Sequence, residues 1–113
     1  MHELWLCNSI LDIIKQQTTD KKCQKVKKIV LEIGQLAAID REALSFSFGV
    51  IAQGTIAENA ELSIIEIPGE ARCDSCQQIV PMKQYYEECL VCGNYSLSLV
   101  QGNELKVKSM VVE

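Results

Sequence analysis

The chain has 113 residues, of which 48% are apolar and 23% charged, so it is long enough for one compact core and has the composition of a folded protein. Its net charge of −4 argues against a nucleic-acid partner, because phosphate binding needs a basic surface. No apolar run approaches the roughly 20 residues of a membrane-spanning helix, and the N-terminal residues lack the features of a signal peptide. We therefore expect a cytoplasmic protein with no membrane partner, whose six cysteines stay reduced.

The first part of the chain predicts a helix followed by a strand. Apolar residues recur at helical spacing between Leu4 and Ile14, so a helix begins almost at once. In KIVLEIGQL the apolar residues Ile29, Leu31 and Ile33 alternate with other side chains, which predicts a strand with one apolar face. The basic run from Lys21 to Lys28 before it is typical of a solvated face, the alternative being a patch for an acidic partner.

A second helix and further strands are predicted after this strand. Asp40 can cap the first turn of a helix that ends near Gly54, because its carboxylate can accept hydrogen bonds from exposed amides. A strand is expected from Glu61 to Ile67, where Pro68-Gly69 ends it. Alternating apolar residues return between Leu97 and Val112, which indicates more β structure near the end of the chain.

Four cysteines form two C-x2-C pairs separated by twelve residues: Cys73, Cys76, Cys89 and Cys92. Two such turns facing each other supply four thiolates for a tetrahedral ion, and Gly93 permits the positive φ that such a turn often needs. With all four positions filled by protein, no site is open to water or substrate, so we predict structural Zn(II). The alternatives are iron in the same geometry, a redox dithiol and free core cysteines. Cys7 and Cys23 stand outside the pattern, and Cys7 lies on the apolar stripe of the first helix.

Together these elements predict an α+β fold in two domains. Residues 1–68 and 96–113 would form a small α/β body of two helices on a mainly antiparallel three-stranded sheet. Residues 69–95 would form an inserted zinc-ribbon lobe, because the strands before and after this segment can pair in one sheet. The lobe is acidic and would repel phosphates, since Arg72 and Lys83 are outnumbered by Glu70, Asp74, Glu87 and Glu88.

The start of the chain suggests a second metal site. His2, the only histidine, can offer its imidazole, its amide and the neighbouring terminal amine to one ion, and the Glu3 amide can add a fourth nitrogen. Four nitrogens in a plane suit nickel(II) or copper(II) better than zinc. A terminal histidine is more often simply solvated, Glu3 can act as a first-turn acid that complements the helix dipole, and Asp40 is explained as a cap, so spacing alone leaves this site open.

The Met-His-Glu start, the EIGQL and FSF segments and the four-cysteine ribbon together resemble the HypA/HybF family of hydrogenase nickel-incorporation proteins, over the whole chain. The resemblance implies a metallochaperone that carries Ni(II) to the [NiFe]-hydrogenase large subunit and works with a nickel-binding GTPase of the same pathway. Some members also serve urease, which would add urease accessory proteins as partners. The family pattern implies nickel ligands at His2, the Met1 amine and Glu3, with Asp40 as a further contributor, and zinc ligands at the four ribbon cysteines. No histidines flank the C-x2-C pairs, so zinc switching through such histidines is not implied.

Other function classes have less support in the sequence. With its single histidine at position 2 the chain offers no serine–histidine–acid set, and it contains no phosphate-binding GxxxxGK[ST] loop, so we do not expect an enzyme. The runner-up is a zinc-ribbon interaction module that binds a protein through the acidic lobe or the basic run and has no nickel role. A third possibility is a rubredoxin-like electron carrier that contains iron. Metal analysis and nickel titration separate these three hypotheses.

Overall fold

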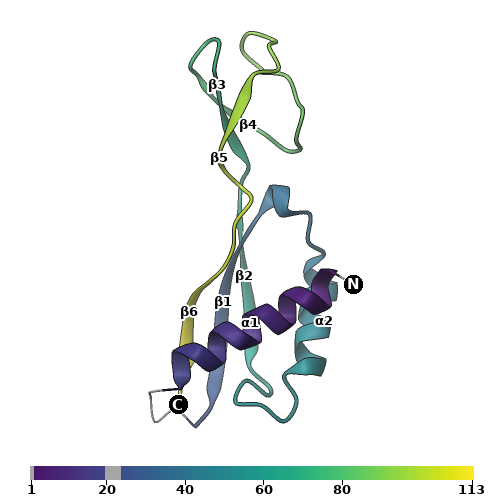
Figure 1. The fold of residues 1–113 in the computed structure, drawn as a ribbon, viewed down its shortest axis with the longest axis vertical. Coiled ribbons are helices and arrows are strands. Elements are labelled where there is room, and N and C mark those ends of the chain that lie inside the picture. Colours follow the sequence, from purple (N-terminus) through teal and green to yellow (C-terminus); the bar gives the residue numbers. More distant parts are fainter. Residues whose placement is uncertain (1, 20–23) are drawn as a thin grey trace. The chain divides into compact units, whose positions relative to one another are not determined.

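The computed structural model describes residues 2–19 and 24–113, and in the first helix it describes side chains from Leu4 onward. Two helices and six strands follow one another in these ranges (Figure 1). Their bounds are α1 His2–Thr18, β1 Val26–Gly34, the short 3-10 helix η1 Gln35–Ala37, α2 Arg41–Ile51, β2 Glu61–Ile67, β3 Glu70–Cys73, β4 Ile79–Pro81, β5 Leu97–Gln101 and β6 Leu105–Val112. No helix within these ranges is long and apolar enough to cross a membrane.

The chain divides into two compact units. The first comprises Met1–Leu31, Ile39–Ile65 and Lys106–Glu113, and the second comprises Glu32–Ala38 and Glu66–Leu105. Each sheet has three strands, in the orders β2-β1-β6 and β4-β3-β5. The predicted α+β class is confirmed.

The first unit has its core between the helices and the central strand β1. Ile29 and Leu31 of β1 are fully buried, as their alternation predicts, and each such side chain contributes roughly 1.5–3 kcal/mol by leaving water. From α1, Cys7 is fully buried and its thiol donates a hydrogen bond to the backbone carbonyl oxygen of Leu44 in α2 (3.4 Å). Cys7 is therefore a core residue that ties α1 to α2.

The two neighbours of β1 reach it in different ways. The backbone N–H of Gly34 donates to the carbonyl oxygen of Glu104 (2.8 Å), and the N–H of Glu113 donates to that of Lys25 (2.8 Å), so β6 runs antiparallel to β1. Figure 1 shows β1 and β2 running in the same direction, as their connection through α2 allows. One pair of this sheet is thus antiparallel and the other parallel.

The second sheet is antiparallel and frames the cysteine segment. β3 pairs with β4 through Ala71 opposite Val80, and with β5 through Cys73 opposite Leu97. The β5 residues, which the sequence analysis assigned to the body, thus pair with a strand of the cysteine segment. Alternation of apolar residues predicts a strand but does not indicate which strand it pairs with, so the pairing of β5 with β3 was not evident from the sequence.

Three glycines of the second unit pack backbone against backbone. A Cβ built on Gly34 would lie 2.0 Å from the carbonyl oxygen of Gly102, and one on Gly69 would lie 2.0 Å from that of Met82. A Cβ on Gly102, where φ is +117°, would lie 2.5 Å from the Cα of Gly69. Only glycine permits this approach, so these positions bring the ends of the ribbon segment together next to η1.

Candidate metal centre

The four ribbon cysteines lie on two turns with the same backbone design. In the first turn, the N–H of Gln77 donates to the carbonyl oxygen of Cys73 (2.8 Å), and the N–H of Cys76 donates to the Cys73 sulfur (3.5 Å). In the second, the N–H of Gly93 donates to the carbonyl oxygen of Cys89 (2.9 Å), and the N–H of Val91 donates to the Cys89 sulfur (3.4 Å). Each turn thus fixes a sulfur and holds the backbone in a tight loop.

Each turn ends on a residue with positive φ, four positions after its first cysteine. Gly93 has φ +79°, which confirms the expectation for that glycine. At the equivalent place in the first turn stands Gln77, with φ +66°. A left-handed residue other than glycine gives no signal in the sequence, so the likeness of the two turns was only partly visible there.

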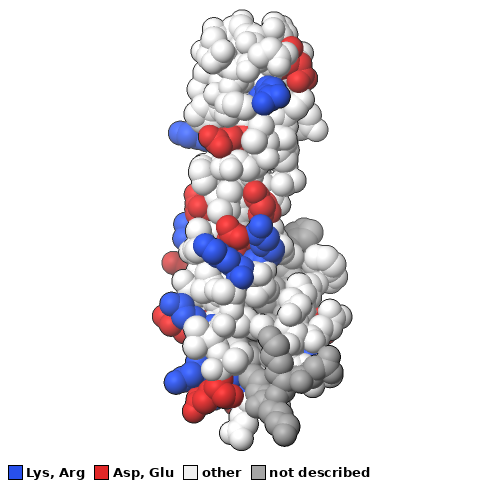
Figure 2. Space-filling model, turned by 90° about the vertical axis from the view of Figure 1, so that its left-hand side faces the viewer, with Lys and Arg blue, Asp and Glu red and all other residues white. Residues whose placement is uncertain are grey.

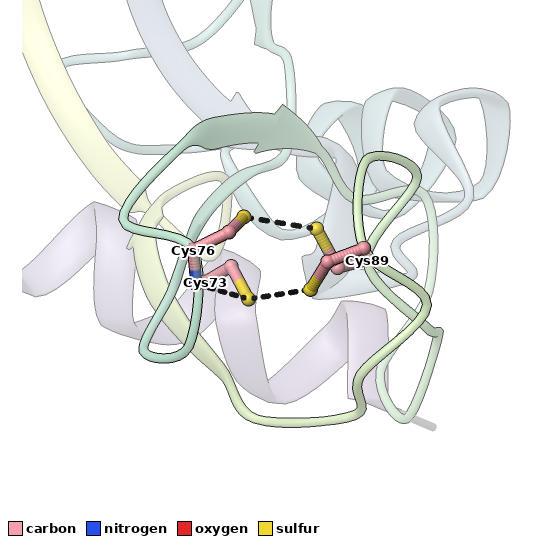
Figure 3. A group of neighbouring side chains, drawn as sticks. Cys73, Cys76 and Cys89 are labelled. Carbon is pink, nitrogen blue, oxygen red and sulfur yellow. Dashed lines mark hydrogen bonds between the residues drawn. The ribbon is translucent and has the colours of Figure 1, made fainter.

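The four sulfurs converge on one point, and all lie within 4.8 Å of one another. The Sγ atoms of Cys73 and Cys92 are 3.5 Å apart. Those of Cys76 and Cys89 are 3.7 Å apart (Figure 3). A tetrahedral zinc ion with Zn–S bonds of about 2.3 Å has sulfurs roughly 3.8 Å apart, whereas a disulfide needs about 2.05 Å. The cluster therefore fits a four-coordinate metal ion, and the cysteines are free thiols.

Burial differs among the four cysteines. Cys73 and Cys89 are buried against Val80 and Leu97, Cys76 is half-buried, and Cys92 is exposed. The ribbon has little other core, since its clusters of buried side chains are small. A structural zinc site contributes roughly 10–16 kcal/mol of binding free energy to folding, which exceeds what so small an apolar cluster supplies.

The crowded thiols of the cluster differ in pKa. The pKa of Cys89 is lowered to about 7, first because the backbone N–H groups of Cys92 and Val91 stabilise its thiolate. At Cys76 the N–H of Gln78 is the largest influence and lowers the pKa, but burial and the three neighbouring cysteines together raise it to about 12. Four thiolates so close together repel one another, and a divalent cation between them removes that penalty.

The donor set also defines what this centre can do. Four thiolates fill a tetrahedral shell and leave no position for water or substrate, so Zn(II) held by Cys73, Cys76, Cys89 and Cys92 would be structural. The described part of the chain contains no second group of three or more histidine, cysteine or acidic side chains close enough to hold a metal.

Of the residues implied as nickel ligands, the structure describes only the side chain of Asp40. Its Oδ1 accepts a hydrogen bond from the N–H of Ala43 (3.1 Å), so Asp40 is the N-cap of α2, as predicted. Met1 lies outside the described residues, as do the side chains of His2 and Glu3, although α1 begins at His2.

Two further interactions of the ribbon were not predicted from the sequence. The hydroxyl of Ser98 donates to both carboxylate oxygens of Asp74 (3.0 Å each), which joins β5 to the first cysteine turn. Oε1 of Glu87 accepts hydrogen bonds from the N–H groups of Lys83 (2.7 Å) and Gln84 (2.9 Å) and so orders the loop before Cys89. Asp74 and Ser98 are far apart in sequence, so no local pattern could have paired them.

Comparison with solved structures finds the same fold. A solution structure of the Ni metallochaperone HypA from Helicobacter pylori matches with a TM-score of 0.70 at 20% identity, over 97% of this chain and 96% of that one. A second solution structure of a HypA protein matches with a TM-score of 0.74 at 23% identity, over 100% of this chain and 97% of that one.

Sequence comparison gives the family. A hydrogenase maturation factor HypA from Legionella pneumophila is 78% identical over 113 residues, and one from Azotobacter chroococcum is 41% identical, each covering both chains in full. The family model described as "Hydrogenase/urease nickel incorporation, metallochaperone, hypA" matches residues 1–112. With its four-cysteine cluster suited to structural zinc and nickel as the cargo of its relatives, the chain belongs to the HypA family of nickel metallochaperones.

Proposed function

We propose that this chain binds Ni(II) at its N-terminus and delivers it during the maturation of [NiFe]-hydrogenase. The ligands would be the imidazole and amide of His2, the Met1 amine and the Glu3 residue, with Asp40 as a further contributor. The nickel-binding domain would be residues 1–68 and 96–113, and residues 69–95 would be the zinc-ribbon domain. The protein acts as a carrier, in keeping with its family.

One observation carries the proposal: α1 begins at His2. The first four N–H groups of a helix have no acceptor within the helix, so the amides of His2 and Glu3 can lose their protons to a metal without breaking helical hydrogen bonds. The helix also anchors the chain end. Its partial positive charge opposes a cation, but each amide proton displaced by the metal adds a negative charge that reverses this effect.

The partners follow from the maturation role. We propose a nickel-binding GTPase of the same pathway and the hydrogenase large subunit, with urease accessory proteins as additional recipients, because the family also covers nickel incorporation into urease. Exchange of nickel with such partners favours a site at a chain end, which another protein can reach, over a buried cage. Free thiols in the ribbon favour the cytoplasm, where they stay reduced.

The test is an isothermal titration of nickel into zinc-loaded protein that begins at Met1 without a tag. We expect one nickel ion per chain, bound with the absorption spectrum of a square-planar nitrogen site. If nickel does not bind this untagged chain, the result favours the alternative function, a zinc-ribbon interaction module with no nickel role.

A further inference from the structure

A groove of about 370 Å³ lies on the ribbon unit, outside the cysteine cluster. All three tyrosines of the chain line it, together with one acidic side chain and an apolar floor. The lining residues are Met82, Tyr85, Tyr86, Glu87, Tyr95, Leu97 and Leu99. Neither the zinc site nor the proposed nickel site uses the tyrosines, so the groove needs its own explanation.

The aromatic rings of the groove are unusually accessible. Tyr86 is 95% exposed and Tyr95 is 71% exposed. The centroids of the Tyr85 and Tyr86 rings are 6.5 Å apart with an interplanar angle of 57°. A cation beside this tilted pair can lie within about 6 Å of both centroids, the range in which a ring face attracts positive charge. Exposed tyrosines gathered at one groove are also typical of protein interfaces.

A fixed carboxylate stands beside these rings. Glu87 is half-buried, and its Oε1 is held by the N–H groups of Lys83 and Gln84 at 2.7 and 2.9 Å. Among the residues that the structure describes, Oε2 of Glu87 accepts no hydrogen bond. The side chain is therefore ordered in advance with one oxygen left for a ligand, which lowers the entropy cost of binding.

From these features we propose that the groove is a docking site for an arginine side chain carried on an apolar segment of a partner protein. Aromatic faces and a carboxylate together recognise a cation, and residues 69–95 carry four acidic against two basic side chains. Figure 2 shows few charged side chains over this unit on the face in view.

Arginine suits this groove better than lysine. Its guanidinium is planar, stacks on aromatic rings and is less strongly hydrated than an ammonium group, and it can donate to the Glu87 carboxylate at the same time. Leu97 and Leu99, which are half-buried and exposed, offer apolar contact to the residues on either side of the arginine, and the buried Met82 lies beneath them. The proposal does not depend on nickel binding at the N-terminus.

The experiment is a titration of the zinc-loaded, 15N-labelled full chain followed by NMR. The probes are the peptide acetyl-Leu-Arg-Leu-amide and its citrulline counterpart, which keeps the shape but lacks the charge. We expect the arginine peptide alone to shift the amide signals of Tyr85, Tyr86, Glu87 and Tyr95 in a saturable way. Equal shifts with the citrulline peptide, or no shift with either at millimolar concentration, would overturn the proposal.

A matched pair of variants tests the carboxylate. Glu87→Gln removes the charge but keeps an oxygen that can accept the Lys83 and Gln84 N–H groups, so the loop should hold. Glu88→Gln removes the same charge from an exposed neighbour that does not line the groove. We expect the arginine peptide to bind Glu87→Gln about tenfold more weakly, the loss of one charge-assisted contact, and Glu88→Gln nearly normally. Equal affinity of the two variants for the arginine peptide would contradict the proposed role of Glu87.

Discussion

His2 is the residue on which nickel binding should depend most directly. We expect His2→Ala to abolish specific nickel binding, because the imidazole would be one anchor of the proposed four-nitrogen plane, and to leave zinc content unchanged, because four cysteines already fill the zinc shell. One glycine added before Met1 should do the same, since it converts the terminal amine into an amide. Nickel calorimetry and metal analysis check both. The matched control is a chain with one glycine added after Glu113, which should bind nickel normally. Normal nickel binding by both N-terminal variants would contradict a site built on His2 and the terminal amine.

Asp40 has two candidate roles that substitution can separate. Asp40→Ala should lower the free energy of unfolding by about 1 kcal/mol, because it leaves the N–H of Ala43 without its cap, whereas asparagine keeps a capping oxygen and should restore most of that loss. Urea unfolding measures the difference. Nickel titration of Asp40→Asn then tests the carboxylate without disturbing the cap. A nickel affinity below that of the unmodified chain, at unchanged stability, would make Asp40 a ligand, whereas an equal affinity would mean that Asp40 serves only as a cap.

At the scale of elements, the ribbon should depend on its metal more than the body does. Cys89→Ala is expected to lose zinc and to unfold the β3–β5 unit, since three thiolates and small clusters of buried side chains cannot hold it together, while signals from α1 and α2 persist in part. Zinc analysis and amide NMR follow the two units separately. If the variant kept one zinc per chain and an unchanged thermal transition, the metal would not be structural.

The matched control for that experiment is another buried cysteine. Cys7→Ala removes a small core side chain of the first unit, which should cost roughly 1–2 kcal/mol and leave both metals bound. Together the two substitutions compare a thiol that packs in a hydrophobic core, Cys7, with a thiol predicted to bind zinc, Cys89.

The elements also show which parts of the fold can be predicted from the sequence. The alternation in β1, the Asp40 cap and the spacing of the four cysteines are local patterns, and each predicted its structure. The pairing of β5 with β3 and the gathering of the tyrosines depend on residues distant in sequence, which local patterns do not relate. The left-handed Gln77 was not predicted because nothing in its side chain requires that backbone.

For the whole molecule, nickel affinity should fall steeply as the solution becomes more acidic. Imidazole, amine and any coordinating amide must each give up a proton to bind, so protons compete with the metal, and the loss becomes severe near the imidazole pKa of about 6.5. Nickel titrations between about pH 7.5 and pH 5.5 measure this dependence. A flat profile would mean that carboxylates rather than nitrogens hold the ion.

The glycine contacts of the second unit have a consequence for genetics. At Gly34 and Gly102 the nearest atoms that a new side chain would strike all belong to the backbone. No substitution elsewhere can trim a carbonyl oxygen or a Cα, so a defect at these positions should have no second-site suppressor on its contact partner. A suppressor screen started from Gly34→Ala should therefore return reversions to glycine, whereas one started from a packing defect in α1 should return compensating changes in its neighbours.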